Sequence, residues 1–243
     1  MPSAAPHRAL VIVPTYNERE NIEQLTEAVL AVSDTFDLLI VDDNSPDGTG
    51  EIVDRLVAQR PDRISVLHRS EKEGIGPAYL AGFRRALDQD VPAIVTMDAD
   101  FSHDPADLPR LLGALANADI ALGSRYTAGG GTAGWPLHRR LISRWGGIYA
   151  QWVLGVHVRD LTSGFKAYRG EVVELLVREG VRSDGYGFQI ETVYRALRHR
   201  FRVVEVPINF HDRTLGRSKL SRRIVLEAMV MVWRLRFERE KAQ

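Results

Sequence analysis

The fold is decided by residues 93–103, which read AIVTMDADFSH. The apolar, β-branched run at the start of this stretch is typical of a buried strand. Two carboxylates, Asp98 and Asp100, follow it with one small residue between them. Because open α/β sheets bind ligands at the carboxyl ends of their strands, we expect both to line a crevice and to converge on one divalent cation that binds a diphosphate. Alternatively, both are ordinary turn residues, and Asp100 caps a helix that begins near Pro105.

The composition excludes several classes of protein. The 243 residues include no cysteine, which excludes disulfides, thiolate zinc sites and cysteine nucleophiles and fits a cytosolic protein. Lysine plus arginine and aspartate plus glutamate both number 32, so the net charge gives no sign of a nucleic-acid partner, and none is expected. No uninterrupted apolar window reaches about 18 residues, and residues 1–8 are too short and polar for a signal peptide. Neither a membrane span nor a signal peptide is predicted.

The basic residues are unevenly distributed along the chain. Two stretches, 120–159 and 213–226, contain no acidic residue. Their basic residues include Arg125, Arg139, Arg140, Arg144 and Arg159 in the first and Arg213, Arg217, Lys219, Arg222 and Arg223 in the second. Local positive fields of this kind suit phosphates or an anionic membrane surface, although solvated helix faces carry similar charges.

The first half of the chain alternates strand and helix patterns. Apolar runs at 9–14, 38–41, 64–67, 93–97 and 120–123 predict strands, and helical patterns lie between them at 21–32, 51–59, 74–87 and 107–116. Thr49 is the predicted cap of the helix at 51–59. This order predicts an α/β protein with a mostly parallel sheet that helices cover on both faces. Neither a dinucleotide-binding glycine motif nor a P-loop is present, so dehydrogenases and P-loop enzymes are not favoured.

The second half has a different character. Residues 164–168 and 202–207 predict two more strands, with a helix at 187–199 between them. Residues 137–154 predict a helix or helical pair with arginines on one side and apolar side chains on another, namely Ile142, Trp145, Ile148, Tyr149 and Trp152. This pattern suits a helix that lies in a membrane interface, or one that packs on the sheet with a solvated basic face. The apolar helix at 221–237 can lie on a bilayer, dock a partner or, for its inner half, pack into the core.

Six motifs occur in the order found in one known family. They are PTYNE at 14–18, VDDNSPDGT at 41–49, MDAD at 97–100, GSRY at 123–126, SGF at 163–165 and RxxGxSK at 213–219. Together they resemble the GT-A-type inverting glycosyltransferases of family 2, specifically the dolichol-phosphate or polyprenol-phosphate mannose synthases, over residues 8–235. The resemblance implies a single GT-A domain over residues 1–243, with a Rossmann-like, mostly parallel sheet and a C-terminal helical part that faces acceptor and membrane. Residues 8–125 would bind the nucleotide sugar, 126–220 the acceptor, and 221–237 would form an amphipathic helix.

The resemblance also implies roles for individual residues. Ten would surround the donor: Pro14, Tyr16, Glu18, Val41, Asp43, Asp98, Ala99, Asp100, Arg213 and Lys219. Three would bind the acceptor phosphate: Arg125, Arg139 and Ser143. Asp100 and Ser102 would hold Mg²⁺ or Mn²⁺, although a serine hydroxyl is the weaker ligand of the two. Asp98, Asp100 and Arg125 would form the catalytic centre.

The implied reaction is transfer of mannose from GDP-mannose to a polyprenyl (dolichyl-type) monophosphate, with inversion to a β-linked product. A phosphate acceptor is anionic at neutral pH, so catalysis needs positioning and charge neutralisation rather than a strong base. Glu191 either contacts sugar hydroxyls or is a helix-surface carboxylate, and its position in the helical pattern favours the surface. Two other functions stay open, namely a UDP-glucose-dependent polyprenyl-phosphate glucosyltransferase and a non-catalytic nucleotide-sugar-binding subunit.

The expected location is the cytoplasm, peripheral to the cytoplasmic face of the membrane. Many relatives carry C-terminal transmembrane helices, whereas this sequence stops shortly after residue 237. We expect the chain to reach lipid through the helix at 221–237 and the Trp- and Arg-rich segment, or through a separate membrane-anchoring or acyltransferase-type subunit.

Overall fold

The computed structural model describes residues 5–212 and 222–238, and the backbone alone for 222–228. The first half alternates strands and helices in this order: β1 (Ala9–Thr15), α1 (Ile22–Val32), β2 (Phe36–Asp42), α2 (Thr49–Gln59), β3 (Ile64–His68), α3 (Ile75–Leu87), β4 (Ala93–Thr96), η1 (Pro105–Asp107), α4 (Leu108–Ala114) and β5 (Ile120–Ser124). The second half contains β6 (Gly131–Ala133), α5 (Leu137–Leu154), β7 (Lys166–Arg169), α6 (Gly170–Glu179), α7 (Tyr186–Arg198), β8 (Val203–Pro207), β9 (Asn209–His211) and α8 (Arg222–Phe237). The predicted α/β class is confirmed.

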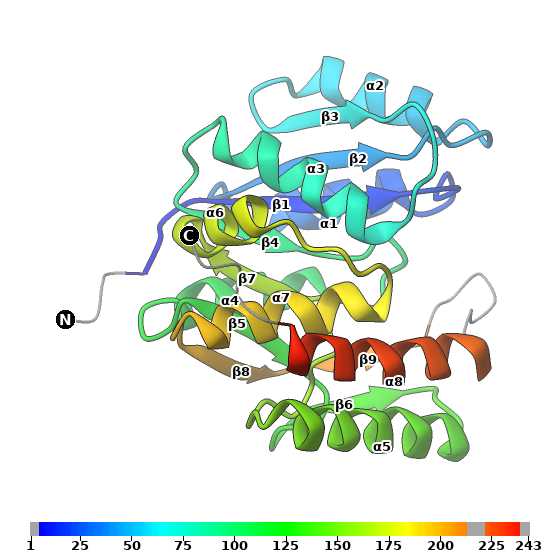
Figure 1. Cartoon of the computed structure of the whole chain (residues 1–243). Coiled ribbons are helices and arrows are strands. Elements are labelled where there is room, and N and C mark those ends of the chain that lie inside the picture. The colour runs from blue at the N-terminus through cyan, green and yellow to red at the C-terminus, as the bar shows by residue number, and fades with distance from the viewer. Residues whose placement is uncertain (1–4, 213–221, 239–243) are drawn as a thin grey trace.

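A seven-stranded sheet runs through the molecule in the order β3-β2-β1-β4-β7-β5-β8 (Figure 1). β1 pairs in parallel with both β2 and β4, so the ends of these three strands meet at one edge. β7 runs antiparallel between β4 and β5, with Lys166 beside Thr96 on one side and Leu122 on the other. The sheet is therefore mostly parallel, as predicted, with one reversed strand near its centre.

Helices cover both faces of the sheet, which explains why its strands are apolar without alternation. Along β1, Val11 and Val13 point to a core with α1, α2 and α4, whereas Leu10 and Ile12 point to a core with α3 and α6. A third core lies between β5, α5, α7 and α8. It includes Val232 and Leu235, so one side of α8 packs inward.

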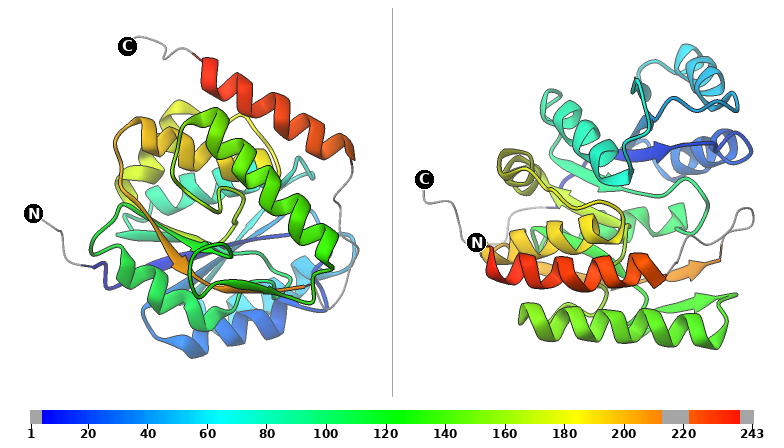
Figure 2. Two further views of the ribbon diagram at one scale, coloured as in Figure 1. Left: turned by 90° about the horizontal axis from the view of Figure 1, so that it is seen from below. Right: turned by 45° about the vertical axis from the view of Figure 1, so that its right-hand side comes forward.

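α5 and α8 lie side by side at one end of the molecule, in green and red in Figure 1, and both views of Figure 2 show the same arrangement. The Tyr149 hydroxyl on α5 donates a hydrogen bond to the Met229 carbonyl on α8 (3.4 Å). α5 is one helix with the predicted bounds, not a pair. Within the described ranges, the structure contains no helix with the length and apolarity needed to cross a membrane.

The predicted cap of α2 is wrong, whereas a helix does begin at Pro105, as the turn-residue alternative expected. Thr49 is the first residue of α2 rather than its cap, because Gly48 takes the cap position at φ 92°. The Asp47 carboxylate accepts hydrogen bonds from the Thr49 amide (3.0 Å) and hydroxyl (2.6 Å). At η1 the capping side chain is Asp104, which accepts from the Ala106 amide (2.9 Å). Asp100 is therefore not the helix cap of the turn-residue alternative.

Candidate active site

A large cavity opens at the carboxyl ends of β1, β2 and β4 and encloses about 990 Å³. Its wall is completed by the loop that precedes β7, by the segment between α6 and α7, by the start of α7 and by the C-terminal half of α8. Nine of the predicted site residues line it: Pro14, Tyr16, Glu18, Asp43, Asp98, Ala99, Asp100, Arg125 and Arg139. Val41 is fully buried in β2, and Val41, Ser102 and Ser143 do not line the cavity. Arg213 and Lys219 lie outside the described residues.

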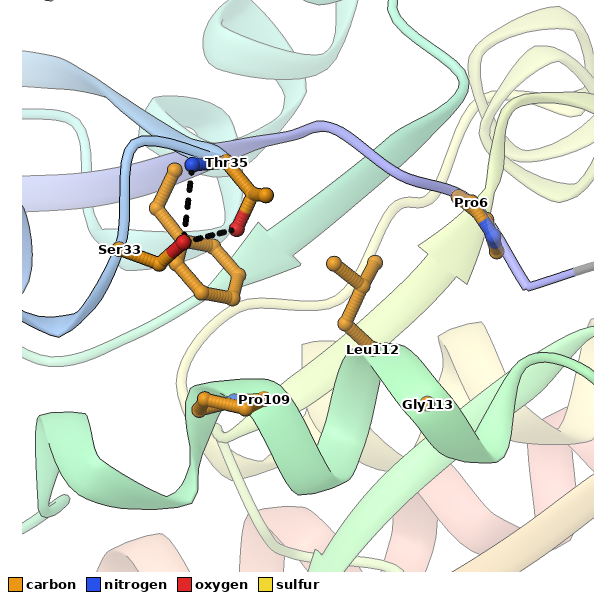
Figure 3. A pocket seen from close by; sticks show the side chains of 7 residues that line it. Pro6, Ser33, Thr35, Pro109, Leu112 and Gly113 are labelled. Carbon is orange, nitrogen blue, oxygen red and sulfur yellow. Dashed lines mark hydrogen bonds between the residues drawn. The ribbon is translucent and has the colours of Figure 1, made fainter.

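A second, smaller cavity of about 240 Å³ lies near the amino ends of β1 and β2, away from these carboxylates (Figure 3). Pro6, Ser33, Leu112 and their neighbours line it, and none of its lining residues is charged. A cavity with this lining offers no charged side chain to hold a metal or a phosphate. The large cavity is the candidate active site.

The chain curls after β4, so that Asp98 and Asp100 both face the large cavity. Phe101 has φ 58°, a left-handed conformation that costs a non-glycine residue energy and is concentrated at functional sites. The Asp100 carboxylate accepts hydrogen bonds from the Ser102 amide (3.0 Å) and hydroxyl (2.5 Å). Ser102 thus orients Asp100. The Asp98 carboxylate accepts a hydrogen bond from the buried Tyr79 hydroxyl (3.3 Å).

His103 stabilises the same turn. It is buried, stacks on Phe165 with ring centroids 4.9 Å apart, and its Nδ1 accepts the Asp98 backbone N–H (3.2 Å). Burial lowers the pKa of His103, although the carboxylates of Asp98 and Asp100 act in the opposite direction. The imidazole is therefore neutral near pH 7, with its proton on Nε2.

The two aspartates fit a hard divalent cation. Both line the cavity, and the Asp98 side chain is 26% exposed there. Mg²⁺ usually takes one or two protein carboxylates and completes its shell with substrate phosphates and water. The described residues contain no group of three or more His, Asp or Glu side chains that could hold a metal by themselves. The residues present therefore suit a metal that arrives with, and is shared by, a diphosphate.

Arg125 anchors the other end of the cavity through a buried ion pair. Its Nε and Nη2 donate to the two carboxylate oxygens of Asp160 (2.7 and 2.6 Å), and Nη2 also donates to the Thr162 hydroxyl (2.7 Å). Burial by itself lowers the pKa of Arg125, but the Asp160 carboxylate more than offsets this and holds the pKa above its ordinary value. Asp160 in turn accepts the Arg125 backbone N–H (2.9 Å). The sequence reasoning did not identify Asp160.

Arg139 extends this end of the site along α5, whereas Ser143 does not. The Arg139 guanidinium lies 4.1 Å from the Trp135 ring centroid and donates to Asp212 (2.8 Å). Ser143 accepts a hydrogen bond from the Tyr126 hydroxyl (2.7 Å) instead of lining the cavity. Arg125 and Arg139 therefore share the aromatic neighbour Trp135, and both present positive charge to the cavity.

The part of the cavity next to β1 and β2 combines an aromatic ring with a carboxylate. The Lys72 ammonium lies 3.6 Å from the Tyr16 ring centroid. The Asp43 carboxylate pairs with Arg69 at 2.6 Å. Burial raises the pKa of Asp43, and Arg69 opposes this by stabilising the charged form.

Glu191 is not the surface carboxylate that the helical pattern favoured. It is 1% exposed and lies on the inner side of α7. Its oxygens accept the backbone N–H groups of Arg182 (3.3 Å) and Ser183 (2.9 Å) and the Arg195 Nε (2.7 Å). Glu191 thus fixes the loop before α7, which forms part of the cavity wall.

Lys166 is a buried amine next to the site, and its titration is testable. Burial lowers the pKa of Lys166 from 10.5 to about 7, although Asp160 and Asp98 oppose this. Between these values the unfolded chain binds more protons than the folded protein, so the Lys166 contribution to the free energy of unfolding rises with pH. We expect the difference in unfolding free energy, wild type minus Lys166→Met, to rise by about 2 kcal/mol from pH 7 to pH 9, as measured by urea denaturation. A difference that stays constant or falls over this range would contradict the assignment.

The structure is that of an α/β protein with a large cavity that carboxylates and arginines line at the carboxyl ends of its strands. Residues 10–176 match the glycosyl transferase family 2 model, and the chain belongs to this family. It is 46% identical over 239 residues to the polyprenol monophosphomannose synthase of Mycolicibacterium smegmatis. The aligned region covers 97% of this chain and 90% of that protein. It is also 44% identical over 227 residues to the undecaprenyl-phosphate mannosyltransferase of Micrococcus luteus, and the aligned region covers 93% of each chain.

Solved structures confirm the GT-A fold. The Mycobacterium tuberculosis glucosyl-3-phosphoglycerate synthase in complex with Mg²⁺ and UDP superposes with a TM-score of 0.69 at 18% identity, over 97% of this chain and 81% of that one. The same enzyme with Mn²⁺, UDP-glucose and phosphoglyceric acid gives a TM-score of 0.69 at 19% identity over the same shares. At these identities the likeness establishes the fold alone.

Proposed function

We propose that this protein transfers mannose from GDP-mannose to a polyprenyl monophosphate, with inversion at the anomeric carbon and with Mg²⁺ or Mn²⁺ as cofactor. The observation that carries the proposal is the 44–46% identity, over nearly the whole chain, to two proteins named for mannose attachment to polyprenol carriers. The cavity supports it, because the carboxylates of Asp98 and Asp100 and the guanidinium groups of Arg125 and Arg139 line one space, as a metal-bridged diphosphate donor and a phosphate acceptor require.

At the donor end we assign Pro14, Tyr16, Glu18 and Asp43 to the nucleoside, with Val41 contributing only backbone because its side chain is buried. Carboxylates accept hydrogen bonds from base N–H groups and ribose hydroxyls, which suits Glu18 and Asp43. The predicted contacts of Ala99 with the donor and of Arg213 and Lys219 with its diphosphate belong to the same proposal.

Asp98 and Asp100 would hold the donor and the metal, with Ser102 acting on Asp100 through its two hydrogen bonds. When bound, the metal would neutralise charge on the leaving diphosphate. The neutral, buried His103 has its Nδ1 occupied by a backbone N–H, so we assign it to shaping the turn rather than to removing a proton.

At the acceptor end, Arg125 and Arg139 would bind the lipid phosphate. The Nη1 group of Arg125 takes part in none of the hydrogen bonds to Asp160 and Thr162, and we assign it to a phosphate oxygen. The Asp160 ion pair holds the guanidinium in place before the acceptor arrives, so little side-chain entropy is lost on binding. Because the phosphate is already anionic, these residues orient it for in-line attack without a general base.

The acceptor is a lipid, and the surface next to the acceptor end suits a membrane. Five apolar residues form an outward stripe along α5: Leu137 (68% exposed), Leu141 (48%), Trp145 (67%), Ile148 (45%) and Trp152 (76%). Trp233 and Phe237 on α8 are exposed as well, and Phe237 also lines the cavity. Apolar and aromatic side chains flanked by arginine are what an interfacial helix uses. We infer that this face meets the lipid surface.

Membrane binding can be tested with two exposed arginines of α5. Replacing Arg140 and Arg144 with glutamine should weaken binding to phosphatidylserine-containing vesicles by about 10- to 30-fold, since each basic residue near an anionic surface contributes about 1 kcal/mol. Sedimentation with vesicles measures this. The control is Arg84→Gln with Arg85→Gln on α3, which changes the net charge equally at two exposed positions far from α5 (Figure 1). Equal weakening by both pairs would contradict the assigned face.

The choice of sugar is tested by competition between donors. Purified protein is given GDP-mannose and UDP-glucose, separately and together, with a short polyprenyl phosphate and Mg²⁺. We expect mannose transfer to dominate. Preferential glucose transfer would identify a glucosyltransferase, and donor binding without transfer from either would identify a non-catalytic subunit.

A further inference from the structure

Gln189 and Lys166 form a buried polar pair beneath the cavity that none of the roles assigned above includes. Lys166 is fully buried in β7, and Gln189 on α7 is 5% exposed and lines the cavity. The Lys166 Nζ donates to the Gln189 side-chain Oε1 (2.6 Å), to the Gln189 carbonyl (3.0 Å) and to the Thr192 hydroxyl (3.3 Å). A buried amine is costly, so its contacts call for an explanation.

The amine fixes which way the Gln189 amide faces. The structure places the amide oxygen Oε1 against the Lys166 Nζ at 2.6 Å, and the same Nζ donates to the Gln189 backbone carbonyl, which can only accept. The amino group Nε2 must then occupy the other branch of the amide. With both the carbonyl and the side-chain oxygen of Gln189 bound to one Nζ, rotation of the amide would break its shortest contact.

The Nε2 branch points to the side of Asp98. A Cβ built on Gly164 would lie 3.4 Å from the Gln189 Nε2 and 3.3 and 3.4 Å from the two Asp98 carboxylate oxygens. Gly164, Gln189 and Asp98 all line the cavity. A donor group and an acceptor group therefore border the same small space, which the absence of a side chain at Gly164 keeps open.

A hydroxyl is the ligand that matches this pair. It can accept from an amide N–H and donate to a carboxylate at once, whereas a phosphate oxygen would be repelled by the Asp98 carboxylate. Glu191, two residues along α7, already has its oxygens bonded to backbone N–H groups and to Arg195.

We propose that the Gln189 Nε2 donates a hydrogen bond to a hydroxyl of the sugar being transferred, beside Asp98, and that Lys166 is the positioning residue that holds this amide. The inference rests on the proposed function, because it requires a nucleotide-sugar donor. It adds a sugar-recognising residue and its buried support to the site.

Gln189→Glu tests the contact, because it keeps the shape and the Lys166 bond and exchanges only the Nε2 donor for an oxygen. We expect affinity for GDP-mannose and kcat/KM for transfer to fall by about 10- to 100-fold, the usual result of leaving one partner of a buried hydrogen bond unsatisfied. Affinity for GDP, which lacks the sugar, should stay within about twofold of wild type. Thermal stability should not fall, since the glutamate pairs with Lys166.

Lys166→Met tests the positioning role with a side chain of similar length and no donors. The ratio of the GDP-mannose and GDP dissociation constants should move in the same direction as in Gln189→Glu, which a general loss of stability would not produce. Thr192→Val removes the third partner of Lys166 and the hydrogen bond from the Thr192 hydroxyl to the Gln189 backbone carbonyl (3.1 Å), but it leaves the bond between Lys166 and the Gln189 side-chain amide in place. This ratio should therefore remain at its wild-type value. A wild-type ratio in both Gln189→Glu and Lys166→Met would overturn the inference.

The wild-type protein separates this inference from the proposed function. If it transfers mannose and Gln189→Glu does so equally well, the inference fails and the function stands. If the wild-type protein uses another nucleotide sugar, the proposed donor is wrong. The ratio of the dissociation constants of that nucleotide sugar and its nucleoside diphosphate, compared between wild type and Gln189→Glu, then tests the role of Gln189. A wild-type protein that neither binds nor uses any nucleotide sugar would overturn both.

Discussion

Asp100→Ala should reduce mannose transfer by about 1000-fold or more at saturating donor and metal, equivalent to about 4 kcal/mol of lost transition-state stabilisation. Asp100 is buried at the end of β4 and is held by the Ser102 amide and hydroxyl, so its carboxylate is in place before any ligand binds. Removing it leaves Asp98 as the one aspartate of the 98–100 turn that can meet the metal. Initial rates with labelled GDP-mannose measure the effect.

The matched control for this variant is Asp104→Ala, four residues along the same turn. Asp104 is exposed and caps η1 through the Ala106 amide, so its loss should cost about 1 kcal/mol of stability and leave transfer within about twofold of wild type. Substantial transfer by Asp100→Ala in the presence of metal would refute the role given to Asp100.

Asp160→Ala should lower the free energy of unfolding by about 3–5 kcal/mol, the largest stability effect that we expect from one substitution. Asp160 is 1% exposed and accepts two hydrogen bonds from the Arg125 guanidinium and one from its amide. Its removal leaves a buried guanidinium without its counter-ion. Equilibrium urea denaturation measures the loss.

Two comparisons make the Asp160 result specific. Adding Arg125→Met to Asp160→Ala should recover part of the lost stability, because the unpaired charge is then absent. Asp34→Ala breaks the exposed pair with Arg63 and should cost less than about 1 kcal/mol. A loss for Asp160→Ala as small as that for Asp34→Ala would contradict the buried ion pair.

The order of strands and helices could be predicted from the sequence because β1, β2, β4 and β5 are buried on both faces and therefore read as apolar runs. Pro136 precedes α5 and marks its start, and Gly155, with φ 69°, follows α5 and marks its end. The antiparallel direction of β7 could not be predicted from the sequence, since an apolar run does not show whether a strand is parallel or antiparallel to its neighbours. Glu191 was assigned to the surface because a helical pattern does not show that α7 is buried on nearly every side.

The candidate site was predictable where its chemistry is local. Asp98 and Asp100 stand next to a strand and were found from that position. Asp160 and Lys166 escaped notice because their partners, Arg125 and Gln189, are 35 and 23 residues away in the chain. Tyr79 approaches Asp98 from α3 and has no motif of its own. The division of the chain at residues 125 and 220 stays a prediction.

The most direct measurement is transfer of labelled mannose from GDP-mannose to a short polyprenyl phosphate, with Mg²⁺ and with EDTA, followed by analysis of the anomeric linkage. The account predicts a β-linked mannosyl phosphate lipid with Mg²⁺, no product with EDTA, and a product from Asp104→Ala but not from Asp100→Ala. Equal transfer in EDTA, an α-linked product, or transfer from UDP-glucose alone would contradict it.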